Sequence, residues 1–176
     1  MAVVVILGGY AWTTYNSFVS LNTGVDGQWA QVETVYQRRF DLIPNLVASV
    51  KGIMKQEQTI FNNLAEARTK YSGAVTVDQK AAAASQVEGA LGRLLAVVEN
   101  YPTLASSGNV RDLMTQLEGA ENRISTERQR YNDAVSAMNI KVQRFPSNVV
   151  ANLFGFNTRE FFQATAGAEV APKVNL

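Results

Sequence analysis

The sequence predicts an all-α protein, an elongated antiparallel helical bundle with an apolar anchor helix at its N-terminus. Apolar residues recur at spacings of three and four along most of the 176 residues, which is the pattern of amphipathic helices that share a core. Strong helix formers dominate between the glycines and prolines, and no segment has the features of a strand. We expect three long helices, the first kinked at Pro44, and a short C-terminal helix.

The composition argues against several classes of function. The net charge of +1 lacks the basic excess of a nucleic-acid binder. Cysteine and histidine are both absent, which removes disulfides, thiol nucleophiles, Ser-His-Asp triads and the usual zinc and di-iron ligand sets. No phosphate-binding glycine motif is present. We therefore expect no catalytic activity, no cofactor, no metal and no nucleic-acid partner.

The first element is an uncharged run, AVVVILGGYAW, over residues 2–12. A helix of that length spans roughly 16 Å, whereas a bilayer core is about 30 Å thick. Extension to Leu21 reaches the required length, although Asn16 and Ser17 dilute the apolar character. Residues 1–21 are interpreted as a membrane anchor, with burial in a protein–protein interface as the alternative. A cleaved signal is disfavoured because no basic segment precedes the run.

The apolar face of this first helix continues past any plausible anchor as far as Trp29. Exposed apolar side chains there would each cost roughly 1.5–3 kcal/mol relative to burial, so we expect identical chains to pack side by side as a homo-oligomer. Gly8 and Gly9 would allow close approach. The competing account is that the bundle folds back over this stretch. The residues predicted to contact lipid or another copy are Val3, Val4, Val5, Ile6, Leu7, Tyr10, Trp12, Tyr15, Phe18 and Val25.

Residues 22–163 are predicted to form the bundle. Its first helix continues to Tyr71 with a kink at Pro44, and the next begins at Asp78 as its N-cap and ends before Pro102. The last long helix is expected from Val110, capped by Asn109, to Arg144. SNVVANLFG should form a short helix that ends at Gly155, and residues 164–176 should form a flexible tail.

Charged residues at or beside core positions are expected to form structural ion pairs between helices rather than a reaction centre. They are Arg39, Glu57, Arg68, Glu118, Glu121 and Arg128. The adjacent Arg38 and Arg39 also suggest a phosphate or lipid-headgroup site, but one solvated and one paired arginine is the favoured interpretation. The aromatic cluster near the C-terminus is interpreted as a cap on the bundle end, with a partner groove as the alternative. It comprises Phe154, Phe156, Phe161 and Phe162.

Long segments of the chain resemble the LemA family. The matching segments are QWAQVETVYQRRFDLIPNLVASVKG, EARTKY, ENYPTLASS, LEGAENRISTERQRYNDAVSAMNIKVQRFPSNVVANLFGF and REFFQ, together with the apolar run that leads into TTYNSF. The resemblance implies a short external N-terminus, one membrane helix and a soluble helical bundle, with no established biochemical activity. The apolar run is shorter than the usual anchor of the family.

We therefore expect a membrane-tethered, self-associating helical scaffold or interaction protein. The alternative, which rests on the family resemblance, is an adaptor for a membrane protease or an envelope-maintenance system. The expected partners are membrane lipid, a second copy of the chain and a membrane protein. We expect a single pass in the cell membrane with the bundle in the cytoplasm, because Arg38 and Arg39 follow the apolar run.

Overall fold

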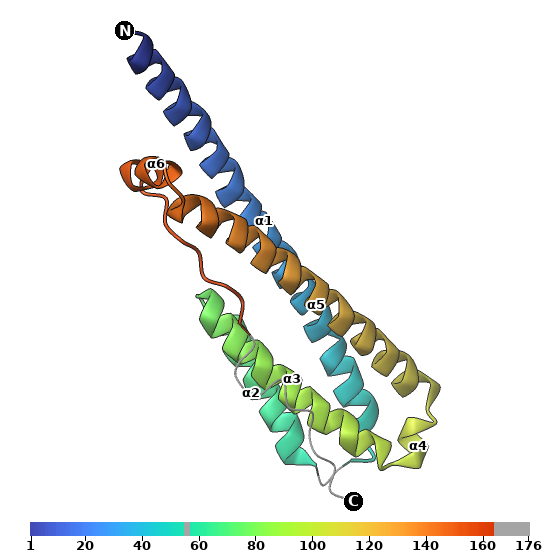
Figure 1. Ribbon diagram of the computed structural model, residues 1–176. Coiled ribbons are helices and arrows are strands. Elements are labelled where there is room, and N and C mark those ends of the chain that lie inside the picture. Colours follow the sequence, from blue (N-terminus) through green and yellow to red (C-terminus); the bar gives the residue numbers. More distant parts are fainter. Residues whose placement is uncertain (55–56, 164–176) are drawn as a thin grey trace, which may run out of the picture. The chain divides into compact units, whose positions relative to one another are not determined.

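The computed structural model describes residues 1–54 and 57–163, and within them every regular element is a helix, as the sequence predicts (Figure 1). The six helices in chain order are α1 (Ala2–Lys51), α2 (Gln58–Gly73), α3 (Val77–Glu99), α4 (Pro102–Ala105), α5 (Gly108–Gln143) and α6 (Ser147–Phe154). The predicted tail, residues 164–176, lies outside the described part of the chain.

Contacts divide the chain into two compact units, each assembled from separate stretches of sequence. Unit 1 contains Met1–Val35 and Ile124–Phe161, and unit 2 contains Tyr36–Arg123 and the chain from Phe162 onward. Helices α1 and α5 therefore contribute residues to both units. The units are described in turn.

The core of unit 1 lies between the first part of α1 and the second part of α5. Both stretches repeat their buried positions every three, four or seven residues, which places these side chains on one helix face. The Trp29 and Tyr131 rings pack with their centroids 5.2 Å apart. The buried side chains are Phe18, Val25 and Val32 of α1 and Ile124, Tyr131, Val135 and Met138 of α5.

Helix α6 and the segment that follows it complete unit 1. The Ser147 hydroxyl donates to the carbonyl oxygens of Lys141 and Arg144, 2.7 and 2.8 Å away. Gly155 ends α6 with a φ of 75°, the left-handed conformation that glycine adopts without a side-chain penalty. The following residues are held against α5 by Asn139, whose side-chain oxygen and amide bond the backbone N–H and carbonyl of Arg159 at 2.7 and 2.9 Å.

Unit 2 contains the second part of α1, the first part of α5, and α2, α3 and α4, with α2 and α3 packed together. Pro44 lies inside α1, and the helix continues past it to Lys51. The chain leaves the helix only after Lys51, where the Met54 N–H donates to the Val50 carbonyl at 2.9 Å. The predicted first helix through Tyr71 is thus wrong in its extent, because two separate helices, α1 and α2, occupy that stretch.

Three predicted helix boundaries also differ from the structure. Thr76 caps α3, because its hydroxyl accepts the Gln79 N–H while the Gln79 side chain returns to the Thr76 N–H, a reciprocal capping box. Asp78 lies in the first turn instead. Pro102 begins the short helix α4, where its missing N–H costs nothing, and α5 already starts at Gly108.

Candidate functional site

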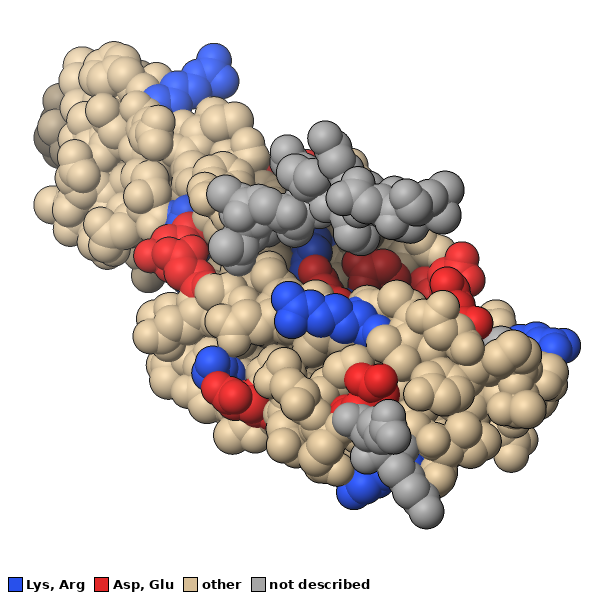
Figure 2. Space-filling model, turned by 90° about the horizontal axis from the view of Figure 1, so that it is seen from below, with Lys and Arg blue, Asp and Glu red and all other residues tan. Residues whose placement is uncertain are grey.

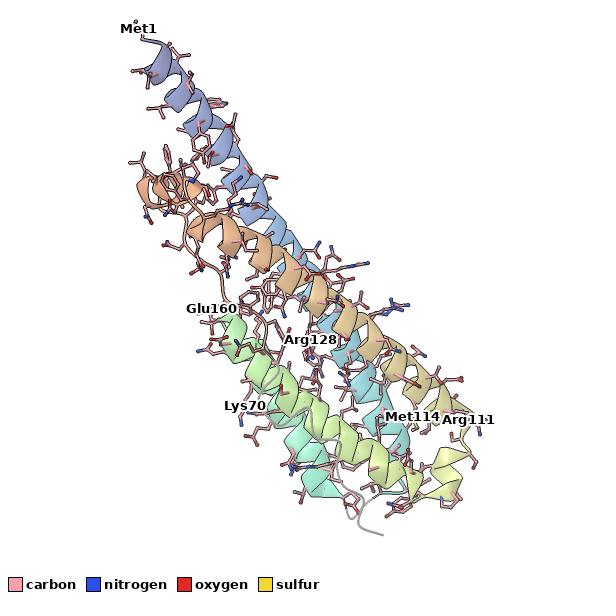
Figure 3. The ribbon with its side chains drawn as sticks, in the orientation of Figure 1. Met1, Lys70, Arg111, Met114, Arg128 and Glu160 are labelled. Atoms are coloured by element: carbon pink, nitrogen blue, oxygen red, sulfur yellow. The ribbon has the colours of Figure 1, made fainter. Side chains whose placement is uncertain are left out.

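The first candidate site is an exposed apolar surface at the start of α1. We call it the N-terminal apolar surface, and its aliphatic members are 62–74% exposed. The helix that carries them begins at Ala2, and within unit 1 no other described element covers its first turns (Figure 3). This surface comprises Val3, Val4, Val5, Ile6, Leu7, Tyr10 and Trp12.

The residues that follow along α1 are progressively covered by unit 1 itself. The Tyr15 ring, still partly exposed, meets the Phe154 and Phe156 rings at centroid distances of 4.9 and 5.6 Å. Phe18 stacks on Phe156 at 4.9 Å and is fully buried. Val25 is also fully buried. The assignment of Phe18 and Val25 as contacts to lipid or another copy is therefore corrected, because the chain folds back over both.

Length and apolarity single out a different helix as able to cross a membrane. Among the described residues that helix is α3, and 44% of the relevant stretch is buried inside the protein. Its Ala84, Val87, Leu91 and Leu94 side chains are core residues of unit 2. A core helix of a soluble protein satisfies the same criteria of length and composition as a membrane span.

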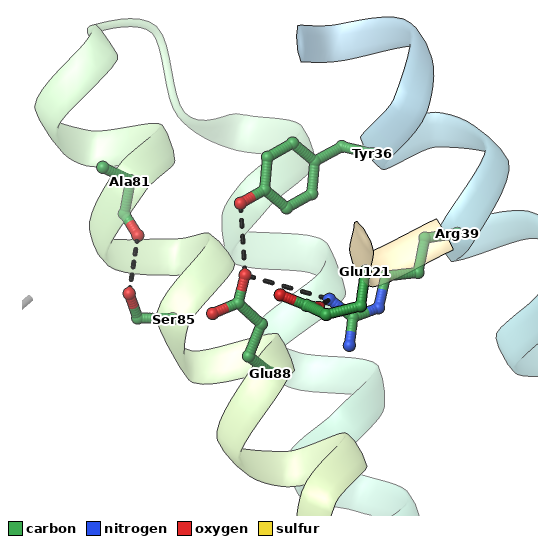
Figure 4. Close-up of polar contacts among 6 residues, drawn as sticks. All are labelled: Tyr36, Arg39, Ala81, Ser85, Glu88 and Glu121. Atoms are coloured by element: carbon green, nitrogen blue, oxygen red, sulfur yellow. Dashed lines mark hydrogen bonds and ion pairs between the residues drawn. The ribbon is translucent and has the colours of Figure 1, made fainter. Parts of the chain in front are cut away.

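The second candidate site is a polar cluster in unit 2, built by three helices (Figure 4). The Arg39 side chain of α1, only 8% exposed, forms ion pairs with Glu121 of α5 and with Glu88 of α3, the latter at 3.8 Å. The Tyr36 hydroxyl donates to the same Glu88 oxygen at 3.2 Å. One buried guanidinium is thus matched by two carboxylates, and the Glu121 side chain is 42% exposed.

The chemistry available to this cluster is that of a structural clamp. The guanidinium of Arg39 offers only hydrogen-bond donors, and the carboxylates of Glu88 and Glu121 accept from it and from the Tyr36 hydroxyl. The Arg39 Nε–H is buried without a hydrogen-bond partner. Within residues 1–54 and 57–163, no group of three or more His, Cys, Asp or Glu side chains is placed to hold a metal ion. The cluster therefore ties α1, α3 and α5 together.

Of the residues that were predicted to form inter-helix ion pairs, the structure brings only some together. Glu121 and Arg39 are brought together, but in the described part of the chain no ion pair joins Glu57, Arg68 or Glu118 to another residue. Arg128 belongs to unit 1 and is half-buried there. Glu88 was missed by the sequence analysis, although it lies one turn from the core positions Ala84 and Leu91.

The two adjacent arginines have different environments. Arg39 turns into the polar cluster, whereas Arg38 is exposed and lines a shallow pocket of about 210 Å³ between α1 and α5 of unit 2, opposite Arg123. Basic and acidic side chains are intermixed on the face shown in Figure 2. The pocket is completed by Leu42, Thr115, Gln116, Gly119 and Ala120.

The predicted aromatic cap is divided between the two units. Phe154 and Phe156 pack on α1 in unit 1, where Phe154 remains half-exposed. Phe162 belongs to unit 2, where its ring stacks 6.2 Å from that of Tyr36. Phe161 is partly exposed. The four phenylalanines therefore do not form one cluster within either unit.

Comparison with known proteins gives a consistent assignment. The model of the LemA family matches residues 28–176. Two proteins of Paramagnetospirillum magneticum (strain AMB-1), magnetosome proteins MamQ 1 and MamQ 2, are each 31% identical over 85% of this chain. Magnetosome protein MamQ of Magnetospirillum gryphiswaldense (strain MSR-1) is 26% identical over 84% of it. In each case the chain spans 64% of the length of the relative.

Proposed function

Because this chain belongs to the LemA family, we propose that it is a membrane-tethered helical interaction protein that self-associates through its N-terminal helix. The similarity to magnetosome proteins also favours membrane association. We place the protein in the cell membrane, with a single pass formed around the first turns of α1 and with the helical units in the cytoplasm. The proposal includes no catalytic activity.

The N-terminal apolar surface is the observation that supports this proposal. Five consecutive aliphatic residues, Val3–Leu7, point in every direction around the helix, so one packing face within the chain cannot cover them. Each such side chain left in water costs roughly 1.5–3 kcal/mol relative to burial. A helix that is apolar all round and uncovered by its own chain is typical of a segment that enters a membrane.

Self-association is proposed for the same turns. A Cβ added to Gly8 or Gly9 would meet nothing within 4 Å apart from the neighbouring residues and backbone of α1 itself, so both positions leave room for another helix to approach. Small residues allow such close approach between membrane helices. The contact surface proposed here includes Tyr10 and Trp12 but not the buried Phe18 and Val25.

Flotation with lipid vesicles tests the tether. The full chain is mixed with phosphatidylcholine–phosphatidylglycerol vesicles and centrifuged in a density gradient, beside a variant with Val4→Asp and Leu7→Asp. The matched control is Val75→Asp, since Val75 is an equally apolar residue that is 86% exposed in unit 2. We expect the wild-type chain and the control to float and the double variant to remain at the bottom. Flotation of the double variant would contradict the tether.

Light scattering of the full chain in detergent tests self-association separately. We expect a mass of more than one chain for the wild type and a lower mass for Gly8→Leu with Gly9→Leu, because bulky side chains keep the helices apart. Gly92→Leu serves as the control, since Gly92 lies on an exposed part of α3 in unit 2. A monomeric wild-type chain would rule out self-association and leave the tether standing.

A further inference from the structure

Helix α6 exposes an apolar face that its own unit does not cover. Its buried side packs through Ser147, Val150 and Ala151, while the opposite side carries Val149 and Leu153, one helical turn apart. The large exposed apolar side chains in and beside this helix are Phe145 (78%), Val149 (59%), Leu153 (74%) and Phe154 (50%). Helix α6 contains no charged residue, and the exposed Asn152 is the polar member of its outward side.

This face lies close to the N-terminal apolar surface. The Phe154 ring contacts Tyr15, three residues beyond the last member of that surface, and Phe156 stacks on Phe18 one turn later. All of these residues belong to unit 1. If the first turns of α1 enter a membrane, α6 therefore lies beside the part of α1 that is at the membrane surface.

The charge distribution around α6 favours a lipid surface over a protein surface. Residues 1–25 contain no charged side chain, and between Asp133 and Glu160 the chain carries only basic residues. These are Lys141, Arg144 and Arg159, of which Arg159 is already neutralised by an ion pair with Asp26. Arg144 is exposed directly before Phe145, and the Lys141 ammonium lies 5.4 Å from the centroid of the Phe18 ring. An anionic headgroup layer complements these charges. A second copy of this chain would bring the same positive charges to the contact.

We infer that α6 is an in-plane membrane helix that rests on anionic lipid. In this arrangement Val149, Leu153 and Phe145 enter the boundary between headgroups and acyl chains, and Arg144 faces the phosphates. The inference rests on the proposed tether, because α1 delivers α6 to the bilayer surface. It adds a second contact with lipid, more than one hundred residues along the chain from the first.

Nitroxide labels measure the immersion of each site in the intact protein. The chain contains no cysteine, so single cysteines can be labelled without other changes. Val149→Cys and Leu153→Cys report on α6, Val5→Cys reports on the tether, and Val75→Cys in unit 2 is the water-exposed control. The full chain is reconstituted in phosphatidylcholine–phosphatidylglycerol vesicles, and collisions with oxygen and with a water-soluble nickel chelate are compared by electron paramagnetic resonance.

We expect the ratio of oxygen to nickel collisions at positions 149 and 153 to exceed that at position 75 several-fold, and the ratio at position 5 to be higher still. A high ratio at position 5 with values at 149 and 153 equal to that at 75 would overturn the inference and leave the tether intact. A low ratio at position 5 as well would overturn both. Low collision rates with both reagents at 149 and 153, with spectral broadening between copies, would show that a second chain covers α6 and would also overturn it.

The preference for anionic lipid has its own test. Arg144→Glu combined with Leu153→Cys should lower the oxygen-to-nickel collision ratio in vesicles that contain phosphatidylglycerol. It should leave the ratio unchanged in pure phosphatidylcholine, because only anionic lipid attracts the arginine. Arg38→Glu, at an exposed position in unit 2, is the matched charge reversal and should leave the ratio unchanged in both. An unaltered ratio for Arg144→Glu in the anionic vesicles would overturn the headgroup contact.

Discussion

Helix α1 is rich in apolar residues at both ends, yet its two ends have opposite environments. Near the C-terminal end Phe40, Leu46 and Val50 are buried in unit 2, whereas Val3 and Leu7 near the N-terminal end are exposed in unit 1. The difference lies in the pattern. The buried end has its apolar residues on one stripe at spacings of three and four, whereas the exposed end has consecutive aliphatic residues. A stripe can be covered by neighbouring helices of one chain, but a fully apolar cylinder needs a surrounding medium.

Placing a charge at equivalent apolar residues of α1 gives the largest expected contrast. Val25→Asp puts a carboxylate without a partner into the core of unit 1 and should lower the free energy of unfolding by at least about 4 kcal/mol. Val5→Asp, at an exposed position, should change it by no more than about 0.5 kcal/mol. Denaturant unfolding in detergent, followed by circular dichroism, measures both. Equal losses would show that the start of α1 is packed like the rest of it.

The ion pairs of the polar cluster test how strongly burial increases the coupling between charges. Removing Arg39 and Glu121 singly and together gives a coupling free energy, which we expect to be about 2 kcal/mol. That value lies between roughly 3–5 kcal/mol for fully buried pairs and under about 1 kcal/mol for exposed ones, because Glu121 is partly solvated. The exposed Glu66–Lys70 pair of α2, at 2.9 Å, is the control, with an expected coupling of about 0.3–0.5 kcal/mol. Equal couplings would mean that Arg39 is as solvated as Lys70.

Two glycines provide the smallest expected effect. Gly155→Ala forces a Cβ into a left-handed conformation at the end of α6 and should destabilise the protein by about 1 kcal/mol. Gly92→Ala, in the interior of α3 with open space around it, should stabilise it by about 0.5–1 kcal/mol through helix propensity. Thermal unfolding monitored by circular dichroism measures both shifts. A stabilising Gly155→Ala would show that α6 does not end in the conformation described.

The helical class could be predicted from the sequence because three-four periodicity is a direct consequence of helix geometry. The break between α1 and α2 could not, because the periodicity continues across it. Val50 and Met54 before the break and Phe61 after it are all buried in unit 2, so the pattern of apolar residues does not show where α1 ends and α2 begins. Pro44 was the stronger breaker signal, yet α1 accommodates it at the cost of one backbone donor.

The sites were predictable to different degrees. Exposure of Val3–Leu7 follows from their consecutive apolar character, whereas burial of Phe18 depends on Phe156, a residue far away in the sequence. Arg39 at a core position required carboxylate partners, and Glu121 was foreseen as one of the residues in ion pairs. Glu88 was missed because an isolated acidic residue in the middle of an alanine-rich helix is normally solvated. Helix α6 was predicted from the sequence, but which of its apolar residues are exposed could be determined only from the structure.

The discontinuous make-up of unit 1 has a consequence for the order of events during synthesis. Its first stretch ends at Val35, but its second ends only at Phe161. Val25 leaves the ribosome 136 residues ahead of Phe161 (161 less 25), and at about 5–20 residues per second this interval is roughly 7–27 s. Until the second stretch, which begins at Ile124, has emerged, the face that carries Phe18 and Val25 has no intramolecular cover. A nascent helix with this face would adsorb to the membrane surface until α5 and α6 arrive to displace the lipid.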